Sequence, residues 1–155
     1  MITRSKRAKL GDVVRFKTPK GFAYLQFIGR HPEYGDAVLV SSDLHGELND
    51  ISAEIFRDSY VTFYPLSAAV AQGLVEVTSN LTPPKMPNRF RRAGARFGDR
   101  ISTWIVEDGS SETVKARLSD EDLRLPIAAI WNHEFLTQRL MERWNPLKEG
   151  YRDDS

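Results

Sequence analysis

The opening third of the chain consists of short segments in which apolar and polar residues alternate, with turn residues between them. Val14 and Phe16 alternate with charged neighbours in the segment 12–17, and an aromatic and branched segment follows at 22–28. A third, more apolar segment lies at 37–40, after turns at 18–21 and 31–36. Strands at this spacing typically form an antiparallel meander. We therefore predict a bent antiparallel sheet or an SH3-like, partly open barrel.

The remaining elements are predicted from periodicity and from capping residues, and they make the class α+β, with a few short helices and one C-terminal helix. In chain order we expect a strand at 60–64, a helix at 66–72, a strand at 74–77, a hairpin from 101–106 and 113–117, a helical turn capped by Ser119, and a helix at 132–144 capped by Asn132. Residues 80–100 lack periodicity and are predicted to be a loop. Trp104, Trp131 and Trp144 should be buried and join the two halves into one core.

The length of 155 residues fits one compact domain. We expect a flexible basic arm at 1–10, a single α+β domain at 11–147 and a polar tail at 148–155. The sequence has no cysteine, which excludes disulfides, thiolate nucleophiles and cysteine-ligated metals. No apolar run approaches the roughly 18 residues of a membrane span, and no signal peptide is evident. We therefore expect a cytoplasmic protein with no membrane partner.

Signatures of catalysis are missing from the sequence. It contains no phosphate-binding glycine loop and no serine nucleophile elbow. The histidines, His31, His45 and His133, do not have metal-ligand spacing. Asp36 precedes a buried strand and is the least implausible acid–base residue, although a role in stabilising the turn explains it better. We expect a non-enzymatic chain with no catalytic residue, no cofactor and no metal.

The net charge of +1 conceals blocks of opposite sign, because residues 33–58 hold seven carboxylates against the single cation of Arg57. Within this block five acids are spaced three or four residues apart, and apolar residues follow each of the first four by one position. The acids are Asp43, Glu47, Asp50, Glu54 and Asp58, and the apolar residues are Leu44, Leu48, Ile51 and Ile55. This pattern predicts apolar residues facing inward and acids facing solvent, with a turn near Gly46 and a short helix from Ser52, as cap, to Arg57.

An exposed acidic face of this kind favours association with a basic protein partner. The opposing interpretation is a solvated surface whose charges are neutralised by the basic blocks of the same chain. A second functional class is nucleic-acid binding by the arginine-rich segment, in which arginines would contact phosphates and a phenylalanine would stack on bases. Its candidate residues are Arg89, Phe90, Arg91, Arg92 and Arg96. The near-neutral net charge weighs against this alternative.

The order of elements over residues 11–92 resembles the immunity-protein-26-type family of bacterial polymorphic toxin systems. The resemblance rests on the runs at 11–14 and 21–26, the strand at Phe63, the run at 74–77 and the motif Pro87-x-x-Phe90. It implies a non-enzymatic inhibitor that binds a cognate toxin and occludes its active site. The acidic face is inferred from this sequence alone, and the oligomeric state is left open.

Overall fold

The computed structural model describes residues 7–48, 50–98 and 100–148. The chain divides into two compact units. The first contains the chain up to Met86 together with Ile130–Trp144, and the second contains Pro87–Ala129 and the segment that follows Trp144. The single domain over 11–147 stays a prediction, and most of the predicted arm and tail, residues 1–6 and 149–155, lies outside the described residues.

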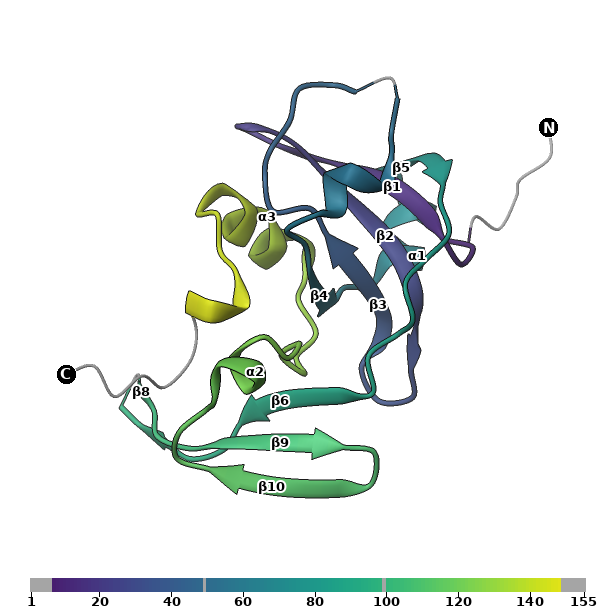
Figure 1. The fold of residues 1–155 in the computed structure, drawn as a ribbon. Coiled ribbons are helices and arrows are strands. Elements are labelled where there is room, and N and C mark those ends of the chain that lie inside the picture. The colour runs from purple at the N-terminus through teal and green to yellow at the C-terminus, as the bar shows by residue number, and fades with distance from the viewer. Residues whose placement is uncertain (1–6, 49, 99, 149–155) are drawn as a thin grey trace. The chain divides into compact units, whose positions relative to one another are not determined.

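The described part of the first unit is built on a five-stranded antiparallel sheet (Figure 1). Its strands are β1 (Asp12–Thr18), β2 (Gly21–His31), β3 (Gly35–Val40), β4 (Tyr60–Phe63) and β5 (Val75–Asn80). Their order across the sheet is β4-β3-β2-β1-β5. The strands β1 to β4 therefore form the predicted meander, and β5 pairs with the other side of β1. Because β4 and β5 are edges, the described strands form an open, bent sheet.

Turn residues set the register of this meander. Thr18 pairs with Gly21, so Pro19 and Lys20 form a two-residue turn between β1 and β2. The Thr18 hydroxyl donates to the Gly21 carbonyl at 2.8 Å. Glycine is required at position 29 of β2, because its φ is +155° and a Cβ there would lie 2.6 Å from Met86 Sδ.

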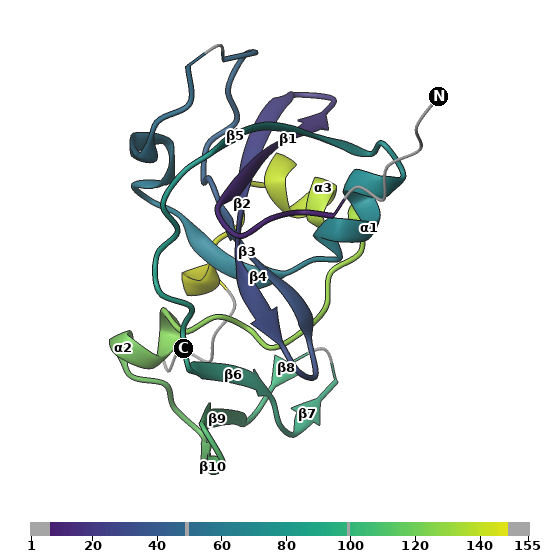
Figure 2. The same cartoon turned by 90° about the vertical axis from the view of Figure 1, so that its right-hand side faces the viewer.

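Two helices of the first unit pack against its sheet (Figure 2). In α1 (Leu66–Ala71) the residues Leu66, Ala69 and Val70 are buried, as their spacing predicts. In α3 (His133–Met141) the buried residues are Leu136 and Leu140. Each fully buried leucine of this kind contributes about 1.5–3 kcal/mol. The predicted cap of α3 is confirmed, since the Asn132 side chain accepts a hydrogen bond from Phe135 N at 2.7 Å.

The last helix ends at Met141, before the predicted end at residue 144. Arg143 has a φ of +56°, a left-handed conformation that a helix cannot continue. Trp144 therefore leaves the helix. Its ring lies 4.9 Å from the ring of Trp131 and 5.2 Å from that of Tyr60, centroid to centroid.

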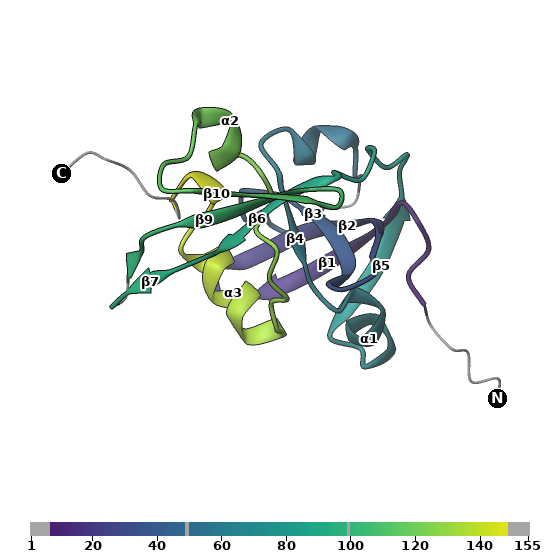
Figure 3. The ribbon, with the colours of Figure 1, turned by 90° about the horizontal axis from the view of Figure 1, so that it is seen from below.

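The described part of the second unit contains a three-stranded antiparallel sheet of order β10-β9-β6 (Figure 3). The elements are β6 (Arg89–Ala93), the paired short strands β7 (Arg96–Phe97) and β8 (Arg100–Ile101), β9 (Trp104–Asp108), β10 (Ser111–Lys115), α2 (Asp120–Leu123) and the 3-10 helix η2 (Pro146–Lys148). The predicted capping box of Ser119 is confirmed, because its hydroxyl accepts from Asp122 N and the Asp122 side chain accepts from Ser119 N. The predicted hairpin is present with Gly109 and Ser110 as its turn, but its strands lie at 104–108 and 111–115 instead of 101–106 and 113–117.

The predicted loop at 80–100 is only partly present. Residues 81–88 carry no helix or strand, but β5 extends to Asn80, and β6, β7 and the start of β8 lie within the segment. β6 does not show the alternation of apolar and polar residues that predicts a strand, because the buried residue in its middle, Arg91, is charged. Arg91 is 0% exposed and lies over the Trp104 ring, with its guanidinium carbon 4.3 Å from the ring centroid.

The three tryptophans are buried as predicted, but they lie in different cores. Trp131 and Trp144 contact each other in the first unit, whereas Trp104 packs with Val106, Leu118 and Leu123 in the second. The class is α+β, with antiparallel sheets and short helices. No helix in the described part of the chain has the length and apolar character that crossing a membrane demands.

Candidate functional site

The described residues of the acidic segment, 43–48 and 50–58, form a bend and one short helix. His45 forms an isolated antiparallel bridge with Phe22, and the chain bends at Gly46. A 3-10 helix, η1 (Ala53–Phe56), follows. The predicted turn and short helix are therefore present. The predicted cap is wrong, because the Ser52 side chain makes no capping hydrogen bond.

Apolar contacts and one tyrosine hold this segment in place. Leu48, Ile51 and Ile55 pack against the buried cluster of Val13, Tyr24 and Phe56. Leu48 N donates to the Tyr24 hydroxyl at 3.0 Å. The one-sided pattern in the sequence thus corresponds to a real inward face, although the described residues before Ala53 form no helix.

The five carboxylates of the acidic segment are all exposed; they are Asp43, Glu47, Asp50, Glu54 and Asp58. Glu47 forms an ion pair with Arg15 at 3.1 Å, and Glu54 pairs with its helical neighbour Arg57 at 3.1 Å. Within the described residues, Asp43, Asp50 and Asp58 form no ion pair. Three of the five acids are therefore exposed and not paired with any cation in the described part of the chain.

Arg15 links the acidic segment to β5, and the sequence gives no sign of this. Its guanidinium lies between Glu47 and Glu76, 2.8 Å from the latter, and 5.3 Å from the centroid of the Phe22 ring. The hydrogen bond to Glu76, with the charges of both glutamates, raises the pKa of Arg15 further. Because these partners come from distant parts of the chain, spacing along the sequence cannot reveal them.

The arginine-rich segment is placed differently from the flexible basic loop that we predicted. Phe90 and Arg91 are buried in β6, so neither is exposed to stack on a base or contact a phosphate. The Arg91 guanidinium donates to the carbonyl oxygens of Leu123 and Pro146, at 3.3 and 2.6 Å. Arg96, in β7, is exposed.

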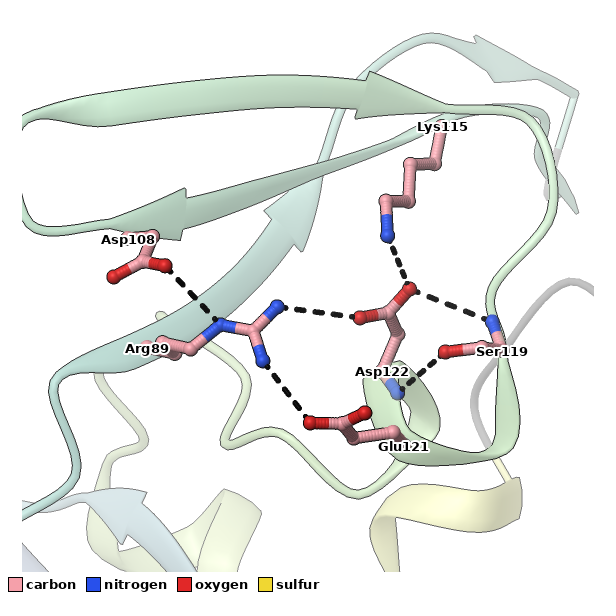
Figure 4. Close-up of polar contacts among 6 residues, drawn as sticks. All are labelled: Arg89, Asp108, Lys115, Ser119, Glu121 and Asp122. Carbon is pink, nitrogen blue, oxygen red and sulfur yellow. Dashed lines mark hydrogen bonds and ion pairs between the residues drawn. The ribbon is translucent and has the colours of Figure 1, made fainter.

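The other two arginines of this segment are engaged by carboxylates of the second unit. Arg89 lies 3.3–3.6 Å from Asp108, Glu121 and Asp122 (Figure 4). Arg92 pairs with Glu107 at 2.7 Å and with Glu112 at 3.1 Å. The hydrogen bonds to these two glutamates raise its pKa. Carboxylates of the same unit thus neutralise Arg89 and Arg92, two of the cations that nucleic-acid binding would need.

Two hollows of the first unit bring polar side chains together. The larger, about 630 Å³, lies beside the turn between β2 and β3 and includes Arg30, His31 and Asp36. Asp36 is buried, accepts from Arg30 Nε at 2.8 Å, and accepts from Ser67 N at 3.0 Å. One carboxylate oxygen therefore stabilises the turn between β2 and β3, and the other stabilises the first turn of α1. Stabilising the turn is the structural role that the sequence suggests for Asp36.

The smaller hollow, about 420 Å³, is lined by His133 and Lys20 among others. The Tyr64 hydroxyl lies 2.8 Å from His133 Nδ1, and the Phe16 ring stacks on the imidazole at 4.5 Å. Burial raises the pKa of Tyr64, so its hydroxyl stays protonated and can donate this bond. Nowhere in the described residues do three or more histidine, aspartate or glutamate side chains gather closely enough to hold a metal ion.

Among these features, the acidic segment combines apolar packing against the first sheet with three carboxylates that pair with no cation of the described residues. Comparisons of the chain with protein-family models, with curated proteins and with solved structures each find no match. The resemblance to the immunity-protein family therefore stays a prediction.

Proposed function

We propose that this chain is a non-enzymatic protein-binding module whose acidic segment contacts a basic protein partner. One observation carries the proposal: every carboxylate of the segment is exposed, while its apolar residues are held against β1 and β2. A charged surface that is already ordered loses little conformational entropy on binding. Its field also accelerates the encounter with a partner of opposite charge.

The finer form of the proposal comes from the family resemblance. The partner would be a bacterial toxin, and this chain would be the immunity protein that covers its active site. A toxin that cleaves nucleic acid needs a positively charged cleft to bind phosphates. Such a cleft is complementary to the charges of Asp43, Asp50 and Asp58.

The first experiment is co-expression with the product of the adjacent open reading frame. The proposal predicts that the two proteins purify as a stoichiometric complex and that the complex has lost the toxic or nuclease activity of the partner. Separate elution of two folded proteins, with the activity of the partner intact, would contradict the toxin assignment.

Charge reversal then tests the surface itself. We choose Asp43→Lys, Asp50→Lys and Asp58→Lys together, because the side chains of these acids form no ion pair with the described residues. The matched control makes the same change of charge at exposed acids outside the segment, namely Glu33→Lys, Asp120→Lys and Glu134→Lys. The proposal predicts that the first variant loses the complex and that the control retains it.

The nucleic-acid alternative has less support. Two of its five residues, Phe90 and Arg91, are buried, and Arg89 and Arg92 are paired with carboxylates. A filter-binding titration separates the two functions. A steep loss of affinity with salt would favour nucleic-acid binding, because each neutralised phosphate releases counterions.

A further inference from the structure

The two larger sheets have four edges, and three of them are protected. Residues Ile130 and Trp131 pair with Phe63 of β4. The segment Pro126–Ala128 pairs in the same way with Arg91 of β6. The register of β5 shifts opposite Val13 and Val14, an irregularity that disfavours pairing with a further strand. The remaining edge, β10, is regular and has no partner on its outer side among the described residues.

The alternation of hydrogen bonds shows which groups β10 directs outward. Asp108 and Ser111 flank a two-residue turn and form a hydrogen-bonded pair, so Thr113 also bonds to β9. Glu112 and Val114 must then point their N–H and C=O groups away from β9. The pairing of β6 with β9 supports this alternation. Val106 bonds to Thr113 of β10, so Arg91, which lies opposite Val106 on β6, directs its N–H and C=O groups away from β9, to Pro126 and Ala128.

The charged side chains that usually block an open edge are engaged elsewhere. Lys115 turns inward, where its Nζ lies 2.6 Å from the buried carboxylate of Asp122 (Figure 4). Glu112 pairs with Arg92 at 3.1 Å. Val114 is 67% exposed. The edge is thus electrically neutral, carries an apolar side chain and lacks the free lysine that discourages strand addition.

We propose that β10 pairs antiparallel with β10 of a second copy of this chain, around a two-fold axis at Thr113. In this register Glu112 of one copy faces Val114 of the other, and each such pair exchanges two hydrogen bonds. All outward groups of the two strands are then satisfied. No like charges stand directly opposite each other, because Lys115 faces Ser111 of the second copy. The proposal is independent of the acidic segment.

We commit to a second copy because β10 is complementary to itself in this register: its two outward residues pair with each other, and Glu112 and Lys115 each face an uncharged residue. The interface is short, and contacts well below about 1,200 Å² are typically weak. We therefore expect self-association at high micromolar to millimolar concentration. Sedimentation velocity across that range should show a concentration-dependent shift from monomer to dimer.

Hydrogen exchange identifies the strand that is used. At the concentration where half of the chains are dimeric, the amides of Glu112 and Val114 should exchange about twofold more slowly than in dilute protein. The amide of Thr113 already bonds to β9 and should change little. A protein that stays monomeric, with unchanged exchange at Glu112 and Val114, would overturn the proposal.

The variant Val114→Glu places a carboxylate directly opposite Glu112 of the second copy and should weaken the dimer at least about tenfold. The control is Val77→Glu, at an exposed valine on the protected edge β5, which should dimerise as the wild type does. A dimer that persists in Val114→Glu, or one lost equally in both variants, would show that another surface forms it.

Discussion

Arg91 is a fully buried cation in the second unit, and its contacts suggest a large contribution to stability. Its guanidinium stacks on Trp104 and donates to two carbonyl oxygens, those of Leu123 and Pro146. Arg91→Ala would leave both carbonyls without this donor and remove the cation–π contact. We predict a loss of about 2–4 kcal/mol in the free energy of unfolding, measured by urea denaturation.

The exposed Arg96 provides the comparison for Arg91. Arg96→Ala should change stability by no more than about 0.5 kcal/mol, as is usual for surface positions. Equal effects of the two substitutions would show that the buried contacts of Arg91 contribute little.

Asp122 should make the second unit sensitive to acid. Burial of its carboxyl would raise the pKa, but hydrogen bonds from Lys115 and Ser119 outweigh burial and lower the pKa below its usual 3.8. Because the pKa of Asp122 is lower in the folded protein than in the unfolded chain, its ionised carboxylate stabilises the fold. This contribution is complete at pH values above the unfolded pKa and is lost as the pH falls through the folded pKa. We predict a loss of stability below about pH 4 that Asp122→Asn reduces. An unchanged acid profile in that variant would contradict this assignment.

His133 should make the stability of the first unit depend on pH in a higher range than Asp122 does. Burial lowers the pKa of its imidazole below 6.5, and the charge of Glu134 opposes only part of that shift. The folded protein therefore favours the neutral ring, and protonation favours the unfolded chain. We predict that the urea midpoint declines as pH falls below about 6.5, and that His133→Gln, which keeps an acceptor for Tyr64, flattens this decline. A decline of the same size in the variant would assign it to other groups.

At the scale of elements, two serines precede short helices, but only one of them forms a cap. The Ser119 hydroxyl accepts from Asp122 N at 3.1 Å, whereas Ser52 makes no capping bond. We predict that Ser119→Ala costs about 0.5–2 kcal/mol and that Ser52→Ala costs less than about 0.5 kcal/mol, by thermal or urea unfolding. Equal costs for both would mean that the capping bond is not the source of the stability.

Local patterns were sufficient to predict most elements of the first unit. Alternation and turn residues predict β1 to β4, and the spacing of Leu66, Ala69 and Val70 predicts α1, because these signals act within a few residues. β6 could not be predicted in the same way. Its buried middle residue is Arg91, whose burial depends on Trp104 and on carbonyl groups supplied by distant segments.

At the scale of the whole molecule, the sequence predicts the exposure of the acidic segment but not what holds it. The alternation of acids with Leu48, Ile51 and Ile55 was enough to separate an inward face from an outward one. The bond from Leu48 to Tyr24 and the ion pair from Glu47 to Arg15 join residues far apart in the sequence. The same is true of the carboxylates that neutralise Arg89 and Arg92, and long-range pairings of this kind leave no periodic signal.

The association rate with the partner, measured by stopped flow over a range of ionic strength, tests the central claim most directly. If Asp43, Asp50 and Asp58 attract a basic partner, the wild-type rate should fall steeply with salt, and the triple lysine variant should associate at least about tenfold more slowly at low salt. The control variant with Glu33, Asp120 and Glu134 reversed should stay closer to the wild type. Equal rates for the wild type and the triple variant at low salt would contradict the account.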